Sequence, residues 1–289
     1  MANKKNGYDG ASVPIVIFFG QSAGGKTTAL VRLIRFLTKK YRPEVSETFY
    51  NHYYGHREDI TFEEVENEVE TQLNTPSYDE IIGTKERALV NIIKREGNGN
   101  NYHCRFLEVP GEDFVDLHKA GHIDVGAAEK NFDYLEDAMS CKYKKIWVFF
   151  FDVDFTSNQE LIQSKDDYVN AMKGIKIGPN DKIIVLLNKI DKVKIGDAKT
   201  SLPPSKYEDF INDNFNKILK SKPFSTKRWS IFGLRDPYNR HFELLDYSSF
   251  RLKKTKKIGV EATLQSEESE DKYPKALWNT INRAINNRF

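Results

Sequence analysis

The segment from Gly20 to Thr27 reads GQSAGGKT and constrains the fold more than any other part of the chain. It satisfies the pattern G-x-x-x-x-G-K-[ST], in which the backbone N–H groups of a glycine-rich loop form a cradle for phosphate. Such a loop needs a buried strand before it and a helix after it, because the helix N-terminus adds a partial positive charge. The sequence provides both: Val13 to Phe19 is an unbroken apolar run, and apolar residues recur at helical spacing from Leu30 to Leu37.

Further apolar runs at Lys145 to Phe151 and Lys182 to Leu187 have the composition of strands buried on both faces. Helical periodicity is visible at 161–175 and at 207–219, so strands alternate with helices. This alternation predicts a three-layer α/β/α P-loop NTPase fold with a mostly parallel sheet.

One antiparallel hairpin is expected at the edge of that sheet. Arg87 to Lys94 and Tyr102 to Val109 are strand-like, and the residues between them, EGNGNN, favour a turn. Nearer the C-terminus, 228–234 and 242–250 also read as strands, of which only one need join the main sheet.

We interpret residues 1–289 as a single domain with two insertions and a C-terminal helix. The first insertion, at about 41–80, is rich in tyrosine and acid, and is either a partner-binding surface or a packed excursion over the core. The second is expected at about 222–242. The final helix is expected at about 274–287, with Pro274 near its start.

Charge and composition limit the partners and the compartment. The chain has 44 basic and 42 acidic side chains, a formal net charge of +2, so we expect no long-range attraction to nucleic acid and no nucleic-acid partner. No apolar run approaches the roughly 20 residues of a membrane-spanning helix. The polar start has no signal-peptide pattern, and Cys104 and Cys141 suit a reducing compartment as packing residues, which together predict a cytoplasmic protein.

A second motif, N-K-I-D at Asn188, Lys189, Ile190 and Asp191, directly follows an apolar strand. Ligands of open α/β sheets bind at the carboxyl ends of the strands, which is where this motif falls. A carboxylate at Asp191 is suited to accept from both N1–H and the exocyclic amine of guanine, and adenine offers no such donor pair. The order of the two motifs therefore favours a guanine nucleotide.

Together these motifs resemble those of Ras-like P-loop GTPases of the translation-factor-related class, over about residues 12 to 195. The family's D-x-x-G motif matches Glu108-Val109-Pro110-Gly111, with Glu108 in place of aspartate. The resemblance implies that Thr27 and Glu108 help to hold Mg²⁺ and that the Gly111 N–H senses the γ-phosphate. The family often has glutamine at the next position to orient the attacking water, whereas this chain has Glu112.

The family also has a threonine that closes over Mg²⁺ and the γ-phosphate. Thr84, which precedes Glu108 by 24 positions, fits this role best, and Thr61 is the competitor. A serine loop that completes the guanine pocket falls either at Ser248 and Ser249 or at Ser230. The nucleotide-binding residues that the resemblance implies are Gly20, Ser22, Ala23, Gly24, Gly25, Lys26, Thr27, Thr28, Asn188, Lys189, Asp191 and Ser248.

The resemblance implies a switch that binds GTP or GDP with Mg²⁺ and hydrolyses GTP, through Lys26, Thr84, Gly111 and Glu112, and that acts on a protein effector or answers to an activating partner. Glu108 and Glu112 favour an alternative, a GTP-binding interaction module with little intrinsic hydrolysis. A P-loop ATPase or kinase, in which the apolar run ending at Asp152 supplies the acidic residue, is the third possibility.

Overall fold

The computed structural model describes residue 8 and residues 13–20, 24–75, 88–95, 101–111, 133–152, 178, 180–188, 242–246, 254–258, 261–265 and 271–287. Its elements, in chain order, are β1 (Ile15–Phe19), α1 (Lys26–Leu37), β2 (Tyr41–Val45), α2 (Glu47–Tyr53), α3 (Phe62–Asn74), β3 (Leu89–Lys94), β4 (Tyr102–Glu108), α5 (Asp133–Ser140), β5 (Lys145–Asp152), β6 (Lys182–Asn188), β7 (Phe242–Asp246), β8 (Lys254–Ile258), β9 (Glu261–Gln265) and α8 (Lys272–Ile285).

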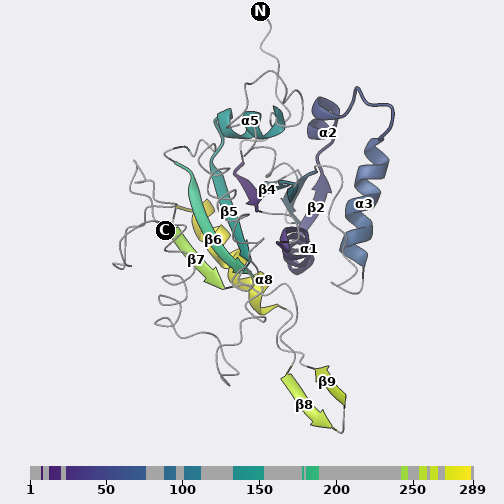
Figure 1. Cartoon of the computed structure of the whole chain (residues 1–289). Helices are drawn as coiled ribbons and strands as arrows, with labels where there is room; N and C mark the ends of the chain where they lie inside the picture. The colour runs from purple at the N-terminus through teal and green to yellow at the C-terminus, as the bar shows by residue number, and fades with distance from the viewer. Residues whose placement is uncertain are drawn as a thin grey trace, which may run out of the picture.

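Seven of the strands form one sheet in the order β2-β3-β4-β1-β5-β6-β7 (Figure 1). The strands from β4 to β7 in this order run parallel, whereas β3 is antiparallel to both of its neighbours. This arrangement confirms the mostly parallel sheet and the β3–β4 hairpin. β8 and β9 pair with each other in a separate two-stranded sheet.

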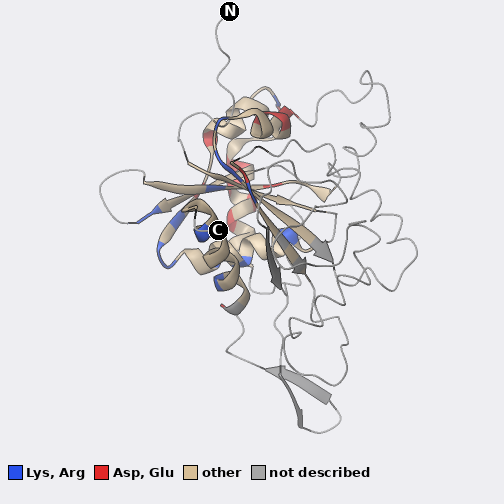
Figure 2. Ribbon diagram, turned by 90° about the vertical axis from the view of Figure 1, so that its left-hand side faces the viewer, with Lys and Arg blue, Asp and Glu red and all other residues tan. Residues whose placement is uncertain are grey.

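Helices cover both faces of the main sheet, which gives the expected three layers (Figure 2). On one face, α1 and α8 pack against alternate β1 residues such as Val16 and Phe18. On the other face, α2 and α5 pack against Ile15, Ile17 and Phe19. The complete burial of all five β1 side chains explains why the sequence there is apolar without interruption.

The segment expected to begin an insertion at residue 41 instead begins with an edge strand. β2 pairs with β3, so the hairpin is not the sheet edge. Pro43 lies opposite Ile92 within this strand, and an edge strand tolerates proline because its outer side forms no ladder hydrogen bonds. With five residues, a proline and two charged side chains, β2 has little of the apolar pattern by which strands are recognised.

The tyrosine-rich part that follows is packed, as one of the two interpretations expected. Phe49, Tyr50 and Tyr54 are buried in the cluster that covers the β1 face, and the Tyr50 hydroxyl donates to the Ile60 carbonyl at 2.6 Å. Both cysteines are buried and unbridged, and burial raises the pKa of the Cys104 thiol. They are therefore packing residues.

Several other expectations fall partly or wholly outside the described residues. The helices at 161–175 and 207–219 and the strand at 228–234 lie there, as does the second insertion apart from Phe242, the first residue of β7. The final helix is confirmed as α8, which begins two residues before Pro274.

The sequence did not predict a core residue at Tyr8, which is fully buried although its neighbours in the sequence are polar. Its hydroxyl donates to the Tyr134 carbonyl at 2.7 Å, and its carbonyl accepts from Arg105 Nη1 at 2.6 Å. Its ring contacts Phe49 and Tyr53 edge to face. Tyr8 thus joins α2, α5 and β4 on one face of the sheet.

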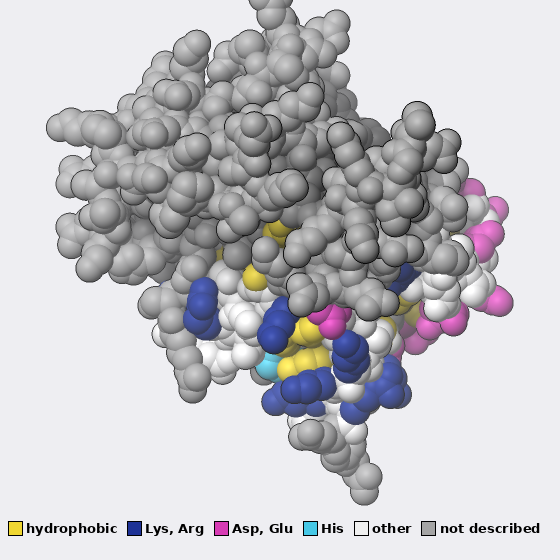
Figure 3. Space-filling model, turned by 90° about the horizontal axis from the view of Figure 1, so that it is seen from below, with side chains coloured by type: hydrophobic (Ala, Val, Ile, Leu, Met, Phe, Trp, Pro, Cys, Tyr) yellow, Lys and Arg dark blue, Asp and Glu magenta, His cyan; other side chains and the backbone are white. Residues whose placement is uncertain are grey.

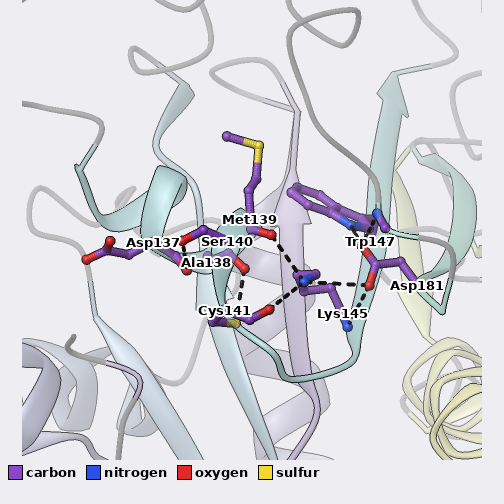
Figure 4. Close-up of polar contacts among 9 residues, drawn as sticks. Asp137, Ala138, Met139, Ser140, Cys141, Lys145, Trp147 and Asp181 are labelled. Atoms are coloured by element: carbon purple, nitrogen blue, oxygen red, sulfur yellow. Dashed lines mark hydrogen bonds and ion pairs between the residues drawn. The ribbon is translucent and has the colours of Figure 1, made fainter. Parts of the chain in front are cut away.

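A buried polar network fixes the amino ends of β5 and β6 (Figure 4). The Asp181 carboxylate, 3% exposed, accepts from the Trp147 indole at 3.2 Å and from the Gly178 N–H at 2.7 Å. It also lies 3.8 Å from Lys145 Nζ, which donates to the Cys141 carbonyl at 3.0 Å. One carboxylate therefore satisfies donors from β5 and from the loop that precedes β6.

Replacement of this carboxylate is predicted to destabilise the protein strongly. Asp181→Ala leaves the Lys145 ammonium buried beside an unpaired indole N–H, and we expect the free energy of unfolding to fall by about 3 kcal/mol. Chemical denaturation measures this change. The exposed ion pair of Asp59 with Arg57 provides the control, because Asp59→Ala should cost less than about 1 kcal/mol. Equal losses in the two variants would contradict the structural role of Asp181.

Candidate functional site

The glycine-rich loop lies between the end of β1 and the start of α1, as the sequence predicts. Gly25 caps α1 in the left-handed conformation, with φ 79° and ψ 21°, which glycine adopts without steric cost. The first turn of α1 has no acidic residue, and no side chain caps it. The positive end of the helix dipole is therefore available to an anion.

Gly20, at the other end of the loop, is required for a different reason. A Cβ atom added there would lie 2.9 Å from Phe150 Cβ and 3.1 Å from the Phe150 carbonyl oxygen. β1 pairs with β5 along its whole length, so the residue that follows β1 lies directly against the Phe150 backbone and side chain. Only glycine fits at position 20 without a clash.

Lys26 and Thr27 occupy the first two positions of α1, and Thr28 follows them. Lys26 is 5% exposed, which is unusually low for a lysine. We expect its ammonium group to reach the phosphate from this position at the start of α1. The Thr27 hydroxyl donates to Glu108 Oε1 at 2.5 Å, which brings together two oxygen groups that lie 81 residues apart in the sequence.

Glu108 is placed by the pairing of β1 with β4. Glu108 is level with Phe18, and the Val109 N–H donates to the Phe18 carbonyl at 2.9 Å. The carboxylate is 6% exposed, and Gly111, three residues further on, is buried. Adjacent hydroxyl and carboxylate oxygens are the hard donors that Mg²⁺ prefers, so this pair fits the metal that the sequence implies.

A hydrogen bond joins the N-K-I-D motif to the glycine-rich loop. Asn188, the last residue of β6, is fully buried, and its Nδ2 donates to the Gly24 carbonyl at 2.7 Å. β6 is separated from β1 by β5, and the two residues lie 164 positions apart in the sequence. The sequence analysis placed Asn188 at the nucleotide pocket but did not foresee this contact, because the motif spacing does not reveal the strand order.

The remaining predicted site residues lie outside the described part of the chain, so their roles stay predictions. They are Ser22, Ala23, Thr84, Glu112, Lys189, Asp191 and Ser248. Thr61, the competitor of Thr84, is described. Its hydroxyl accepts from the Glu64 N–H at 3.2 Å, and its backbone N–H donates to Glu64 Oε2 at 2.7 Å, which together form a capping box at the start of α3.

Two other features of the described residues bear on the kind of site. They contain no cluster of three or more His, Cys, Asp or Glu side chains arranged to bind a metal. None of their helices is both long enough and apolar enough to cross a bilayer.

No family model and no curated protein matches the chain. Among solved structures, it is similar to the Saccharomyces cerevisiae Ski7 GTPase-like domain bound to GTP, with 14% identity and a TM-score of 0.45, over 96% of this chain and 51% of that one. It is also similar to a signal recognition particle receptor SRb-GTP/SRX complex from Chaetomium thermophilum, with 13% identity and a TM-score of 0.42, over 95% and 99%.

A third similar structure is Roco2 RocCORdC from Methanosarcina barkeri bound to GDP, with 9% identity and a TM-score of 0.37, over 95% of this chain and 49% of that one. The chain thus spans about half the length of the Ski7 and Roco2 chains. At these identities and TM-scores the similarity assigns neither a ligand nor an activity to this chain.

The Asn188–Gly24 contact generates a prediction about the loop. Asn188→Ala removes the donor of the hydrogen bond to the Gly24 carbonyl. We therefore expect the free energy of unfolding to fall by about 1–3 kcal/mol. We also expect faster amide hydrogen exchange, most strongly in the peptide that contains residues 20–28. Asn279→Ala, at an exposed position of α8, is the control. Unchanged exchange in the loop peptide would show that Asn188 does not hold it.

Proposed function

We propose that this protein binds GTP and GDP with Mg²⁺, hydrolyses GTP to GDP and phosphate, and acts as a nucleotide-dependent switch. The observation that supports this most is the Asn188–Gly24 hydrogen bond, because it joins the phosphate-loop motif to the motif suited to guanine. Either short motif alone can occur by chance, but the contact between them in the fold makes a guanine-nucleotide site a more specific interpretation.

In this proposal the nucleotide lies across the carboxyl ends of β1, β5 and β6. The loop N–H groups from Gly20 to Thr27 and the Lys26 ammonium bind the phosphates. Lys189 and Asp191 bind the guanine, with Ser248 in the loop that completes its pocket. Asn188 acts by positioning the phosphate loop beneath the nucleotide.

Mg²⁺ would be held by Thr27, with Glu108 beside it and Thr84 from the segment that precedes β3. When bound, the metal neutralises charge on the phosphate groups. Glutamate at 108 reaches one methylene further than the aspartate of the family pattern, and the 2.5 Å contact with Thr27 is consistent with a carboxylate at this metal site.

The reaction proposed is an in-line attack of water on the γ-phosphorus without a covalent intermediate. The chain contributes mainly charge and position: Lys26 compensates the charge that develops on the transferred group, and the Gly111 N–H binds the γ-phosphate. Thr84 and the segment after Gly111 are ordered by GTP and released after hydrolysis, which a protein effector or activating partner detects.

A second possibility, a GTP-binding interaction module with little hydrolysis, is favoured by Glu108 and by Glu112, because a carboxylate beside a triphosphate repels the negative charge on the γ-phosphate oxygens in the transition state. Single-turnover hydrolysis, with Glu112→Gln as the comparison, separates the two. A variant that hydrolyses GTP much faster than the wild type would favour the interaction module.

Nucleotide binding is the first prediction of this proposal. A fluorescent GDP analogue should bind in the presence of Mg²⁺, and unlabelled GTP should displace it far better than ATP does. Lys26→Ala should abolish binding while the circular dichroism spectrum stays that of the folded protein. If ATP competes as well as GTP, the guanine assignment fails and the protein is a P-loop ATPase or kinase.

Base recognition is the second. Asp191→Asn reverses the hydrogen-bonding pattern presented to N1 and the exocyclic group, so affinity for GTP should fall by about tenfold or more and xanthosine triphosphate should bind better. Competition with the two nucleotides measures both changes. Retention of full preference for GTP would place base recognition at another residue.

A further inference from the structure

One edge of the fold is strongly basic, although the whole chain is nearly neutral. The edge comprises the end of α1, the outer strand β2, the β3–β4 hairpin and α8. Its exposed cations, named here the basic edge, are Lys39, Lys40, Arg42, Lys94, Arg95, Lys275 and Arg283. Seen from below, Lys and Arg side chains surround a hydrophobic area that includes a histidine (Figure 3).

Contacts between the elements place the cations at the ends of α1 and β3 beside β2 and the start of α8. Lys94 lies opposite Tyr41 in the β2–β3 register, and Arg95 Nε donates to the Tyr41 carbonyl at 3.2 Å. Lys39 Nζ lies 3.0 Å from Asp271 Oδ2, which joins the end of α1 to the start of α8.

Acidic side chains at this edge are few. Among the described residues of these segments, Glu108 is buried at the far end of β4, and the others are Glu44 and Asp271, each paired to a cation, Glu44 to Arg42 at 3.1 Å. Both ion pairs are exposed and exchange readily with other partners. The balancing acid lies elsewhere: α3 carries five glutamates and no lysine or arginine. The net charge of +2 therefore conceals a segregation of charge.

Aromatic rings occupy the middle of the basic edge. Tyr41, His103 and Trp278 contact one another, with ring centroids 5.2–5.4 Å apart. Trp278 is buried at the base of this group, whereas Tyr41 and His103 are half-buried and keep part of each ring at the surface. The rings are therefore partly covered by their neighbours, and only Tyr41 and His103 contribute to the described surface.

We propose that the basic edge binds single-stranded nucleic acid, with phosphates at the cations and a base stacked on the Tyr41–His103 rings. Sequence-tolerant single-strand sites combine these two features, a positively charged surface and aromatic rings level with it. An anionic membrane would share the electrostatic attraction, but membrane-binding surfaces present exposed apolar residues for insertion, whereas Trp278 is buried here and Tyr41 and His103 are half-buried.

This site is separate from the proposed nucleotide site. Along β4, His103 and Glu108 are five residues apart, a separation of about 17 Å. Lys26 and Leu37, the two ends of α1, are 11 residues or about 17 Å apart, and Lys39 lies beyond Leu37. The two ligands therefore do not compete, and variants of the basic edge keep their GDP binding, so failure of one proposal leaves the other intact.

The electrostatic part is tested with a fluorescent oligouridylate of about 16 nucleotides, near the upper size of such sites, titrated with the full chain at several salt concentrations. We expect the logarithm of the affinity to fall linearly with the logarithm of salt concentration. Lys94→Gln with Arg95→Gln should reduce that slope by about 1.4, because each lost phosphate contact removes about 0.7. Arg57→Gln, between α2 and α3, is the control and should leave the slope unchanged.

The stacking part of the proposal is tested with variants that change the aromatic ring and keep the charge. Tyr41→Leu should weaken the oligonucleotide about fivefold or more without altering the salt slope, because it removes the stacking ring. Tyr41→Phe keeps the ring and should bind like the wild type. Thermal melting confirms that both variants fold.

Three results would overturn the proposal. One is the absence of oligonucleotide binding at low salt, including the case in which phosphatidylserine vesicles bind and the oligonucleotide does not. Another is equal affinity for the duplex of the same sequence, which hides its bases from Tyr41. The third is equal behaviour of Tyr41→Leu and Tyr41→Phe.

Discussion

The site depends on one buried hydrogen bond, from the Asn188 amide to the carbonyl of Gly24. A glycine-rich loop is costly to order, because glycine loses more conformational freedom than any other residue on folding. Here the loop is held at three points: β1 and Phe150 enclose Gly20, α1 begins at Lys26, and Asn188 holds the middle. The described ends of the proposed phosphate loop are thus held by the sheet and by α1.

The same geometry explains how far sequence could predict the site. β1, the loop and α1 were predictable because an apolar run, a glycine motif and a helical period follow one another without interruption. The resemblance implies that Thr27 and Glu108 share a metal site, and the structure brings the two side chains within 2.5 Å of each other, while their role at a metal stays a prediction. The contact of Asn188 with Gly24 was not predictable from spacing, since it depends on β5 lying between β1 and β6.

Elements with mixed composition were harder to predict. β2 was missed because Pro43 and two charged residues hide a five-residue edge strand. The sequence T-F-E-E from Thr61 to Glu64 matches a capping box and therefore indicates the start of α3, although the tyrosine-rich residues before it have only a weak hydrophobic pattern. The distribution of charge was also not predictable from composition. The total charge is nearly neutral, although α3 is acidic and the ends of α1, β3 and α8 are basic.

The burial of Tyr8 shows that the core includes a residue ahead of β1. Seven residues upstream of β1, this side chain fills a space among Phe49, Tyr53 and Tyr134, and its carbonyl receives the guanidinium of a largely buried arginine. A truncated chain that started at β1 would open a cavity and strip Arg105 of an acceptor. Recombinant domains of this protein should therefore retain Tyr8, and affinity tags belong ahead of it.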